Sequence, residues 1–290
     1  MKILVLGSEG QLGCCLYDQL AETNYQVTYA SRHNFDLAKI DSLAKKILLE
    51  KPNLVINAAA FTNVDKAESC YEEANLINHL AVVKIAEACK HLNSWLIHIS
   101  TDYVFDGKAT NPYTENTKTN PKSAYGNTKL MGEIGIKSSG CKYLIIRTSW
   151  VYSEYGNNFL KTMLKIAEKK EELSIVDDQI GCPTYAQDIA KAIQSMLPKI
   201  ALNRMNSEIL HFCGDTTLTW YEFAKAIFIE ASTYELKTPK KINAIKSSDF
   251  FTPALRPAYS VLECSKIKNV FNIYPSNLKS GIRKTIKKLG

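Results

Sequence analysis

Residues 2–13 read Lys-Ile-Leu-Val-Leu-Gly-Ser-Glu-Gly-Gln-Leu-Gly, and this stretch decides the fold. Its apolar run predicts a buried parallel strand over residues 2–6, and a helical pattern begins after Gly10. Glycines at 7, 10 and 13 match a G-x-x-G-x-x-G dinucleotide fingerprint. Gly7 permits the tight turn, Gly10 lets the backbone approach a pyrophosphate, and Gly13 lets the helix pack on the strand. We therefore predict a nucleotide site here, with the phosphates at the N-terminus of the helix.

The rest of the first half repeats this alternation of apolar runs and helical patterns. Further strands are predicted at residues 26–30, 54–57, 95–99 and 143–146, with a long helical stretch over residues 74–91. Such βαβ alternation predicts the α/β class, as a Rossmann-type, doubly wound parallel sheet. After Trp150 the alternation weakens, and helical runs at 159–169 and 220–231 mix with proline-containing loops. We expect an NAD(P)-binding Rossmann domain over residues 1–150. Residues 151–290 are expected to form mainly a smaller substrate-binding region, and the return of some segments to the first domain stays open.

Small and polar residues follow four of the predicted strands. They are Gly7, Asn57-Ala58-Ala59-Ala60, Ser100-Thr101 and Thr148-Ser149-Trp150. In an open parallel sheet the ligand lies beyond the carboxyl ends of the strands. Packing alone would not place such residues at four strand ends, so we expect these segments to surround one site.

Tyr125 and Lys129 have the spacing Tyr-x-x-x-Lys, which places both side chains on one face of a helix. A lysine ammonium beside a phenol favours the phenolate and lowers the pKa of the tyrosine. A hydroxyl from Thr101 or Ser100 could share the carbonyl oxygen being reduced. The group predicts proton transfer coupled to hydride transfer from a bound cofactor, although the spacing alone also fits an amphipathic surface pair.

The end of the second predicted strand bears on the choice of cofactor. An NAD-specific site usually has a carboxylate here for the ribose 2′-OH. This chain has Ser31 and Arg32 instead, which suit a 2′-phosphate. We therefore expect NADPH, with NADH possible, and an ordinary solvated turn is the alternative. Asp36 and Leu37 are expected to flank the adenine.

Composition limits the class of protein and its partners. The net charge is +7, and residues 231–290 hold twelve Lys and Arg against three Asp and Glu. This basic tail lacks interleaved aromatic residues, so no nucleic-acid partner is expected. No apolar run approaches a membrane span, and the N-terminal stretch does not read as a signal peptide. Eight scattered cysteines without Cys-x-x-Cys indicate reduced thiols, a cytoplasmic location and no zinc site.

Longer motifs resemble the extended short-chain dehydrogenase/reductase family, and within it the dTDP-4-dehydrorhamnose reductases. The resemblance covers nearly the whole chain, from Gly7 to Arg256-Pro257. The motifs that carry it are Ser100-Thr101-Asp102-Tyr103-Val104-Phe105-Asp106-Gly107, Tyr125-Gly126-Asn127-Thr128-Lys129, Arg147-Thr148-Ser149-Trp150-Val151-Tyr152, Gly156-Asn157-Asn158-Phe159 and Asp177-Asp178-Gln179.

The resemblance implies reduction of the 4-keto group of dTDP-4-dehydro-β-L-rhamnose by NAD(P)H, which yields dTDP-L-rhamnose for cell-surface polysaccharide. By the family pattern, Tyr125 protonates the C4 alkoxide, Lys129 holds the nicotinamide ribose, and Thr101 is the hydroxyl partner. Further positions match cofactor contacts at Gly10, Gln11, Leu12, Ala60, Phe61 and Thr62, and substrate contacts at Asp102, Trp150, Asn158 and Arg256. Without the resemblance, each of three substrate positions also has a structural explanation. Trp150 could be a core residue, Asp102 could cap the turn after its strand, and Arg256 could anchor its loop.

One departure from the family concerns metal. Some members bind magnesium through carboxylates at a dimer interface, but Cys15 and Gln187 stand at two of those positions here. A thiol and an amide are poor ligands for a hard cation, so we expect no metal and either a monomer or a homodimer. Rival functions are a reductase of another nucleotide-activated 4-keto-6-deoxy sugar, a non-catalytic regulatory subunit, and a redox-sensing nucleotide binder.

Overall fold

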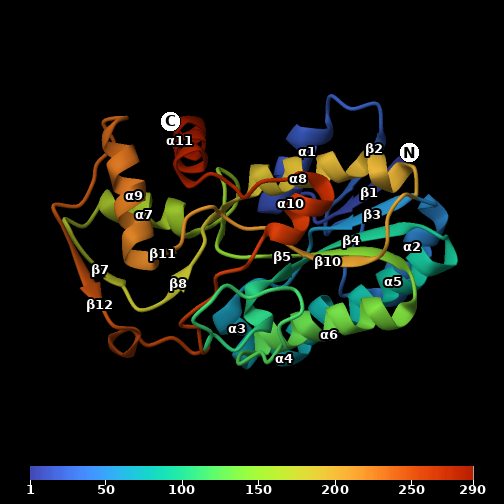
Figure 1. Cartoon of the computed structure of the whole chain (residues 1–290), viewed down its shortest axis with the longest axis horizontal. Coiled ribbons are helices and arrows are strands. Elements are labelled where there is room, and N and C mark those ends of the chain that lie inside the picture. Colours follow the sequence, from blue (N-terminus) through green and yellow to red (C-terminus); the bar gives the residue numbers. More distant parts are fainter. Residues whose placement is uncertain (290) are drawn as a thin grey trace.

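The computed structural model describes residues 1–289, and its centre is a sheet of six parallel strands (Figure 1). The spatial order is β10-β5-β4-β3-β1-β2, so the order reverses between β1 and β3. This confirms the predicted doubly wound parallel sheet and places the crevice for a ligand beside β1. The strands are β1 (Lys2–Leu6), β2 (Gln26–Ala30), β3 (Leu54–Asn57), β4 (Trp95–Thr101), β5 (Lys142–Thr148) and β10 (Glu208–His211).

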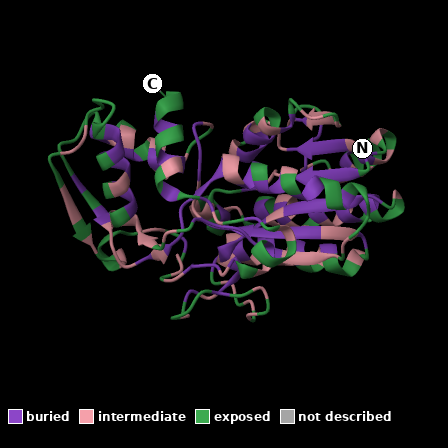
Figure 2. Ribbon diagram, turned by 45° about the horizontal axis from the view of Figure 1, so that its top comes forward, coloured by how far each residue is buried: buried purple, intermediate pink, exposed green. Residues whose placement is uncertain are grey.

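Helices cover both faces of this sheet, and its strands are mostly buried between them (Figure 2). The central strands are therefore apolar on both sides. One face packs against α1 (Gln11–Leu20), α8 (Ala186–Ala201) and α10 (Ser265–Phe271). The other packs against α2 (Ile40–Glu50), α5 (Ala81–His91) and α6 (Ala124–Ser139). The helical stretch expected over 74–91 is present, but it consists of α4 (Tyr71–Asn75), a π-helical turn (Leu76–Leu80) and α5.

The remaining elements form a smaller part beside the carboxyl ends of the strands (Figure 1). Its core combines α7 (Phe159–Ala167), α9 (Trp220–Ser232) and α11 (Leu278–Leu289) with a parallel pair, β7 (Glu172–Val176) and β12 (Lys241–Ile245). Residues after 150 therefore divide between this part and the sheet, to which they contribute α8, β10 and α10.

Short elements complete the fold. They are α3 (Val64–Ser69), the 3-10 turns at Asp102–Val104 and Ser247–Asp249, and two two-stranded pairings, β6 (Val151–Tyr152) with β9 (Thr184–Tyr185) and β8 (Ile180–Gly181) with β11 (Leu218–Thr219). Over residues 1–289, no helix combines the length and the apolar character needed to cross a membrane.

Candidate active site

A cavity of about 750 Å³ lies at the carboxyl ends of β1, β3, β4 and β5. One end of it, here called the glycine-rich end, is lined by Gly7, Gly10, Gln11 and Leu12. The opposite end, here called the polar end, is lined by Thr101, Asp102, Tyr125, Lys129, Trp150 and Arg256. The fold thus brings the segments that follow four strands to one cavity.

The glycine-rich end is built by backbone. Gly7 has a φ of 81°, and a Cβ on it would lie 2.7 Å from the Ala59 nitrogen. A Cβ on Gly13 would lie 2.1 Å from the Gly7 oxygen, so helix α1 can approach β1 only without a side chain there. Gly10 is the N-cap and offers no side-chain cap. The first N–H groups of α1 are therefore free to receive an anion.

The end of β2 lies at the rim of the glycine-rich end. Arg32, Asp36 and Leu37 line the cavity, while the Ser31 hydroxyl lies 3.4 Å from Asn34 Oδ1 within its own turn. The Arg32 side chain is 73% exposed, and its Nε lies 3.8 Å from Asp36 Oδ1. An ion pair this exposed contributes little to stability, so the guanidinium can turn to an anionic ligand at small cost.

Asp102 is the first residue after β4, and its side chain is buried at the polar end. Its Oδ1 accepts a hydrogen bond from Thr101 Oγ1 at 2.8 Å, whereas no described residue donates to Oδ2. Burial raises the pKa of this carboxyl to about 6. A buried carboxylate oxygen without a donor is unfavourable in the free protein, and a ligand hydroxyl would satisfy it.

Ser100, the alternative to Thr101, also lines the cavity, but its hydroxyl is bonded to a buried carboxylate. Its Oγ donates to Glu133 Oε1 at 2.5 Å, and Arg147 binds the same carboxylate with distances of 2.9 and 2.6 Å. The Glu133–Arg147 pair is bidentate, and both residues are buried. Loss of any of these hydrogen bonds would leave a buried charge without a partner, which is unfavourable. Of the two hydroxyls that the sequence leaves open, Thr101 is the one adjacent to Asp102 Oδ1.

Tyr125 and Lys129 project from α6 into the polar end, as their spacing predicts. The surroundings of the lysine differ from the expectation, because its Nζ donates to the Ile99 carbonyl at 2.6 Å and lies 3.3 Å from His98 Nε2. Burial lowers the pKa of Lys129 to about 8. Burial raises the pKa of Tyr125, and the Thr101 hydroxyl offsets only part of that rise. The phenol is thus held in its protonated form, whereas helical spacing alone predicts a lowered pKa.

Two stacked tryptophans form part of the cavity wall. Trp150 has a φ of 47°, a strained conformation for a large side chain, and its ring stacks on Trp220 with centroids 3.5 Å apart. Both rings line the cavity. Trp220 begins α9, about seventy residues after Trp150, and no local motif marks it. Sequence reasoning missed it because only the packing of α9 brings it to the cavity.

Arg256 reaches the polar end from the loop between β12 and α10. Its guanidinium pairs with Asp65 Oδ2 at 2.7 Å and lies 3.4 Å from the Tyr103 hydroxyl. The pair is one-quarter to one-third exposed, so it is accessible from the cavity. Residues 231–290 contain twelve basic residues, and among the described residues only Arg256 of these twelve lines the cavity.

Four other expected site residues do not line the cavity, and one of them, Gly13, lies against the Gly7 oxygen beneath helix α1. Ser31 faces its own turn, the Phe61 N–H donates to Asn78 Oδ1 at 2.8 Å, and Asn158 caps α7. Asn158 Nδ2 also donates to Gln11 Oε1 at 2.9 Å. Asn158 therefore supports the glycine-rich end through Gln11, a contact between segments almost 150 residues apart. Ala60 and Thr62, also expected, do line the cavity.

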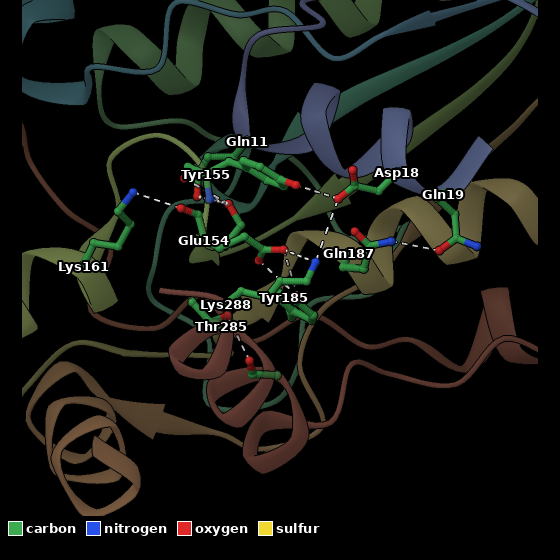
Figure 3. Close-up of polar contacts among 12 residues, drawn as sticks. Gln11, Asp18, Gln19, Glu154, Tyr155, Lys161, Tyr185, Gln187, Thr285 and Lys288 are labelled. Carbon is green, nitrogen blue, oxygen red and sulfur yellow. Dashed lines mark hydrogen bonds and ion pairs between the residues drawn. The ribbon is translucent and has the colours of Figure 1, made fainter. Parts of the chain in front are cut away.

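The region of Cys15 and Gln187 carries a lysine rather than a carboxylate cluster. Figure 3 shows Lys288 of α11 between Asp18 and Glu154, with an ion pair to Glu154 and a distance of 3.9 Å to Asp18 Oδ2. Gln187 Nε2 donates to Gln19 Oε1 at 2.9 Å. Burial raises the pKa of the Cys15 thiol. Within residues 1–289, no group of three or more His, Cys, Asp and Glu is arranged to hold a metal ion.

Comparison with known proteins agrees with this geometry. A family model described as the RmlD substrate binding domain matches residues 1–290. The chain belongs to this family. A dTDP-4-dehydrorhamnose reductase of Sinorhizobium fredii is 39% identical over 291 residues, which cover 99% of this chain and 97% of that protein. The resemblance inferred from the motifs is confirmed.

Solved structures of the RmlD family have the same fold. A dTDP-4-dehydrorhamnose reductase of Clostridium acetobutylicum superposes with a TM-score of 0.92 at 36% identity, covering 100% of this chain and 99% of that one. A dTDP-4-dehydrorhamnose reductase of Bacillus anthracis, solved in complex with NADP, gives a TM-score of 0.90 at 32% identity and covers 99% of both chains.

Proposed function

We propose that this chain reduces the 4-keto group of dTDP-4-dehydro-β-L-rhamnose with NADPH to form dTDP-L-rhamnose. The observation that carries the proposal is that one cavity contains both ends. The backbone N–H groups that can bind an anion and the side chains of Thr101, Asp102 and Tyr125 line the same cavity. Membership of the RmlD family and the names of its relatives support this substrate.

The glycine-rich end holds the cofactor, which supplies a hydride when bound. The N-terminus of α1, with Gly10, Gln11 and Leu12, receives the pyrophosphate, and Ala60 and Thr62 lie along the cofactor. Asp36 and Leu37 flank the adenine. Arg32 receives the 2′-phosphate, which favours NADPH over NADH. That one solved relative is a complex with NADP supports this choice.

The polar end holds the sugar and supplies the proton. Tyr125, kept as a phenol by burial, protonates the developing C4 alkoxide, and Thr101 shares that oxygen. Lys129 binds the nicotinamide ribose. Asp102 Oδ2 accepts a sugar hydroxyl, Trp150 covers the sugar ring, and Arg256 exchanges Asp65 for the substrate diphosphate.

The described cysteines are all free thiols, and the closely similar relatives are biosynthetic reductases. Eight free thiols are typical of a protein in a reducing compartment, so we propose that the protein acts in the cytoplasm. We propose separately that it is a monomer or a homodimer.

The test is oxidation of NADPH, followed at fixed protein concentration, against dTDP-, UDP- and GDP-linked 4-keto-6-deoxy sugars. We expect turnover with dTDP-4-dehydro-β-L-rhamnose and identification of the product as dTDP-L-rhamnose. Preferential turnover of another sugar would replace this substrate with that one. Binding of NADPH without turnover of any sugar would favour the regulatory or redox-sensing alternative.

A further inference from the structure

Residues 153–158, here called the bridging segment, lie against the glycine-rich end of the cavity. Gly156 lines the cavity, and a Cβ on it would lie 3.0 Å from Gln11 Cγ. Two polar side chains of the segment contact the oxygen of the same glutamine. The Ser153 hydroxyl lies 3.0 Å and Asn158 Nδ2 lies 2.9 Å from Gln11 Oε1. The bridging segment therefore packs directly on the side chain that begins α1.

These contacts determine which way the Gln11 amide faces. Asn158 Oδ1 accepts the Lys161 N–H at 3.1 Å in the first turn of α7, so its Nδ2 is the atom that faces Gln11. Gln11 must accept this hydrogen bond with Oε1, and the Ser153 hydroxyl donates to that same oxygen. The Nε2 donors of Gln11 are thereby left for a ligand, and donors are what a phosphate group requires.

The other side of the bridging segment is bonded to α11 (Figure 3). The Glu154 side chain is 5% exposed, forms an ion pair with Lys288, and accepts the Tyr185 hydroxyl at 3.1 Å. Lys288 Nζ also lies 3.9 Å from Asp18 Oδ2, which accepts the Tyr155 hydroxyl at 2.7 Å. One ammonium therefore balances a buried carboxylate of the bridging segment and a carboxylate of α1.

Lys288 keeps its charge in this position. Burial alone would lower the pKa of Lys288, but the hydrogen bond and the charge of Glu154 outweigh it, so the pKa is raised. The helix that carries the lysine is anchored in the core of the smaller part by Leu278, Ile282 and Ile286. A second cation of α11, Arg283, pairs with Glu230 of α9 at 2.7 Å, within that same part. Of these two ion pairs, the one made by Lys288 reaches the bridging segment.

We propose that Lys288 is a positioning residue for cofactor binding, which holds Glu154, and with it the bridging segment, where that segment orients the Gln11 amide for the cofactor phosphates. This inference rests on the proposed cofactor site at the glycine-rich end. Without the ammonium, Glu154 is a buried carboxylate that has lost its counter-charge, and it gains free energy by moving toward water. The bridging segment moves with it, and Gln11 loses the two donors that orient it.

The test is the affinity of the protein for NADPH and for NADH, measured by fluorescence titration without sugar. Lys288→Met should raise both Kd values by about 2- to 30-fold. The factor should be the same for the two cofactors, because both contain the pyrophosphate. Lys288→Arg retains a cation and should restore most of the affinity. Unchanged Kd values in Lys288→Met would overturn the proposal, as would a loss confined to NADPH.

Arg283→Met is the matched control, because it also removes a cation of α11 from a buried carboxylate. The two pairs are alike in exposure, with side chains 47% exposed for Lys288 and 55% for Arg283, and 5% and 8% for their carboxylate partners. Loosening of α11 should therefore be similar in both variants. We expect Arg283→Met to bind both cofactors as wild type does. An equal loss of affinity in this control would show that α11 acts only through general stability, which contradicts the proposal.

Glu154→Gln tests the same contact from its other side. It keeps an acceptor for the Tyr185 hydroxyl, and the half-exposed Lys288 is then solvated, so no buried charge is left without a partner. We expect both Kd values to rise again. The double variant Glu154→Gln/Lys288→Met should differ little from the more strongly affected single variant, because both changes act through one contact. Fully additive effects would contradict the proposal.

The two proposals fail separately. A wild-type protein that binds neither cofactor overturns the proposed function, and this inference with it. A wild-type protein that binds NADPH with an affinity that Lys288→Met leaves unchanged overturns only the role of Lys288.

Discussion

The two ends of the cavity use different functional groups: backbone groups at one end and side chains at the other. At the glycine-rich end the functional groups are backbone N–H groups, and Gly7 and Gly13 act by lacking a side chain. At the polar end they are buried side chains whose protonation depends on their neighbours, as with Asp102 and Lys129. A binding surface made of backbone follows from local sequence, whereas an acid–base group acquires its properties only in the folded protein.

The difference has a consequence for substitution. Changes at the polar end, apart from Lys129 with its proposed contact to the nicotinamide ribose, should alter chemistry and pH dependence while leaving cofactor binding intact. Changes at the rim of the glycine-rich end should alter cofactor affinity and leave the chemical step intact. The following predictions test this separation.

Tyr125→Phe should lower kcat by on the order of 10²–10⁴, because it removes the general acid. NADPH affinity, measured by fluorescence titration, should remain within about twofold because the phenol does not belong to the glycine-rich end. Tyr113→Phe is the control, since its hydroxyl bonds Asp106 away from the cavity and its loss should leave kcat nearly unchanged. Substantial turnover by Tyr125→Phe would remove this tyrosine from the mechanism.

Asp102→Asn should change how stability depends on pH. Burial raises the pKa of the Asp102 carboxyl to about 6, so between about pH 4 and 6 the folded state retains a proton that the unfolded chain has lost. This group therefore stabilises the fold at low pH, and the contribution is lost as pH rises. Relative to the asparagine variant, wild type should lose about 2–3 kcal/mol of unfolding free energy over this range, by urea titration. A difference that is constant with pH would contradict the shift.

Arg32→Ala should weaken NADPH binding by about 10- to 100-fold, the range expected for a charge-assisted hydrogen bond. NADH binding should hardly change, since NADH has no 2′-phosphate. His33→Ala, an exposed neighbour outside the cavity lining, is the control. Equal use of both cofactors by wild type, or loss of NADH activity in Arg32→Ala, would show that Arg32 has another role.

Trp220→Phe is expected to have the smallest effect. It weakens the stack on Trp150, and such aromatic pairs contribute about 0.5–1.5 kcal/mol beyond their buried area. The free energy of unfolding should fall by about 1 kcal/mol, and KM for the nucleotide sugar should rise a few-fold while the Kd for NADPH stays constant. A change in NADPH affinity larger than the change in KM would show that the two ends are coupled through this wall.

Much of the fold could be predicted from local patterns. The strands at 2–6, 26–30 and 54–57 have the bounds that their apolar runs indicate, and the predicted parallel sheet is confirmed. The helical stretch 74–91 has a π-helical turn at Leu76–Leu80 that helical periodicity does not reveal. The sixth strand, β10, could not be assigned to the sheet in advance, because its pairing with β5 depends on a return of the chain after more than fifty residues.

The candidate site divides in the same way. Gly7, Gly10 and Gly13 mark a turn by their spacing, and Tyr125 and Lys129 share a helix face by theirs. Trp220 and His98 gain their places only through contacts between distant segments. No spacing rule could have identified them.

By itself, the sequence determined the parallel sheet, the glycine turn and the helix that carries Tyr125 and Lys129, because these depend on backbone sterics and short-range periodicity. The tertiary structure alone decided the protonation of that helix's side chains. It buries Tyr125, and this loss of solvation raises the pKa of the phenol, the reverse of the change that helical spacing predicts. The physical reason is that a pKa depends on desolvation and on every neighbouring dipole and charge, and those neighbours come from strands far away in the chain.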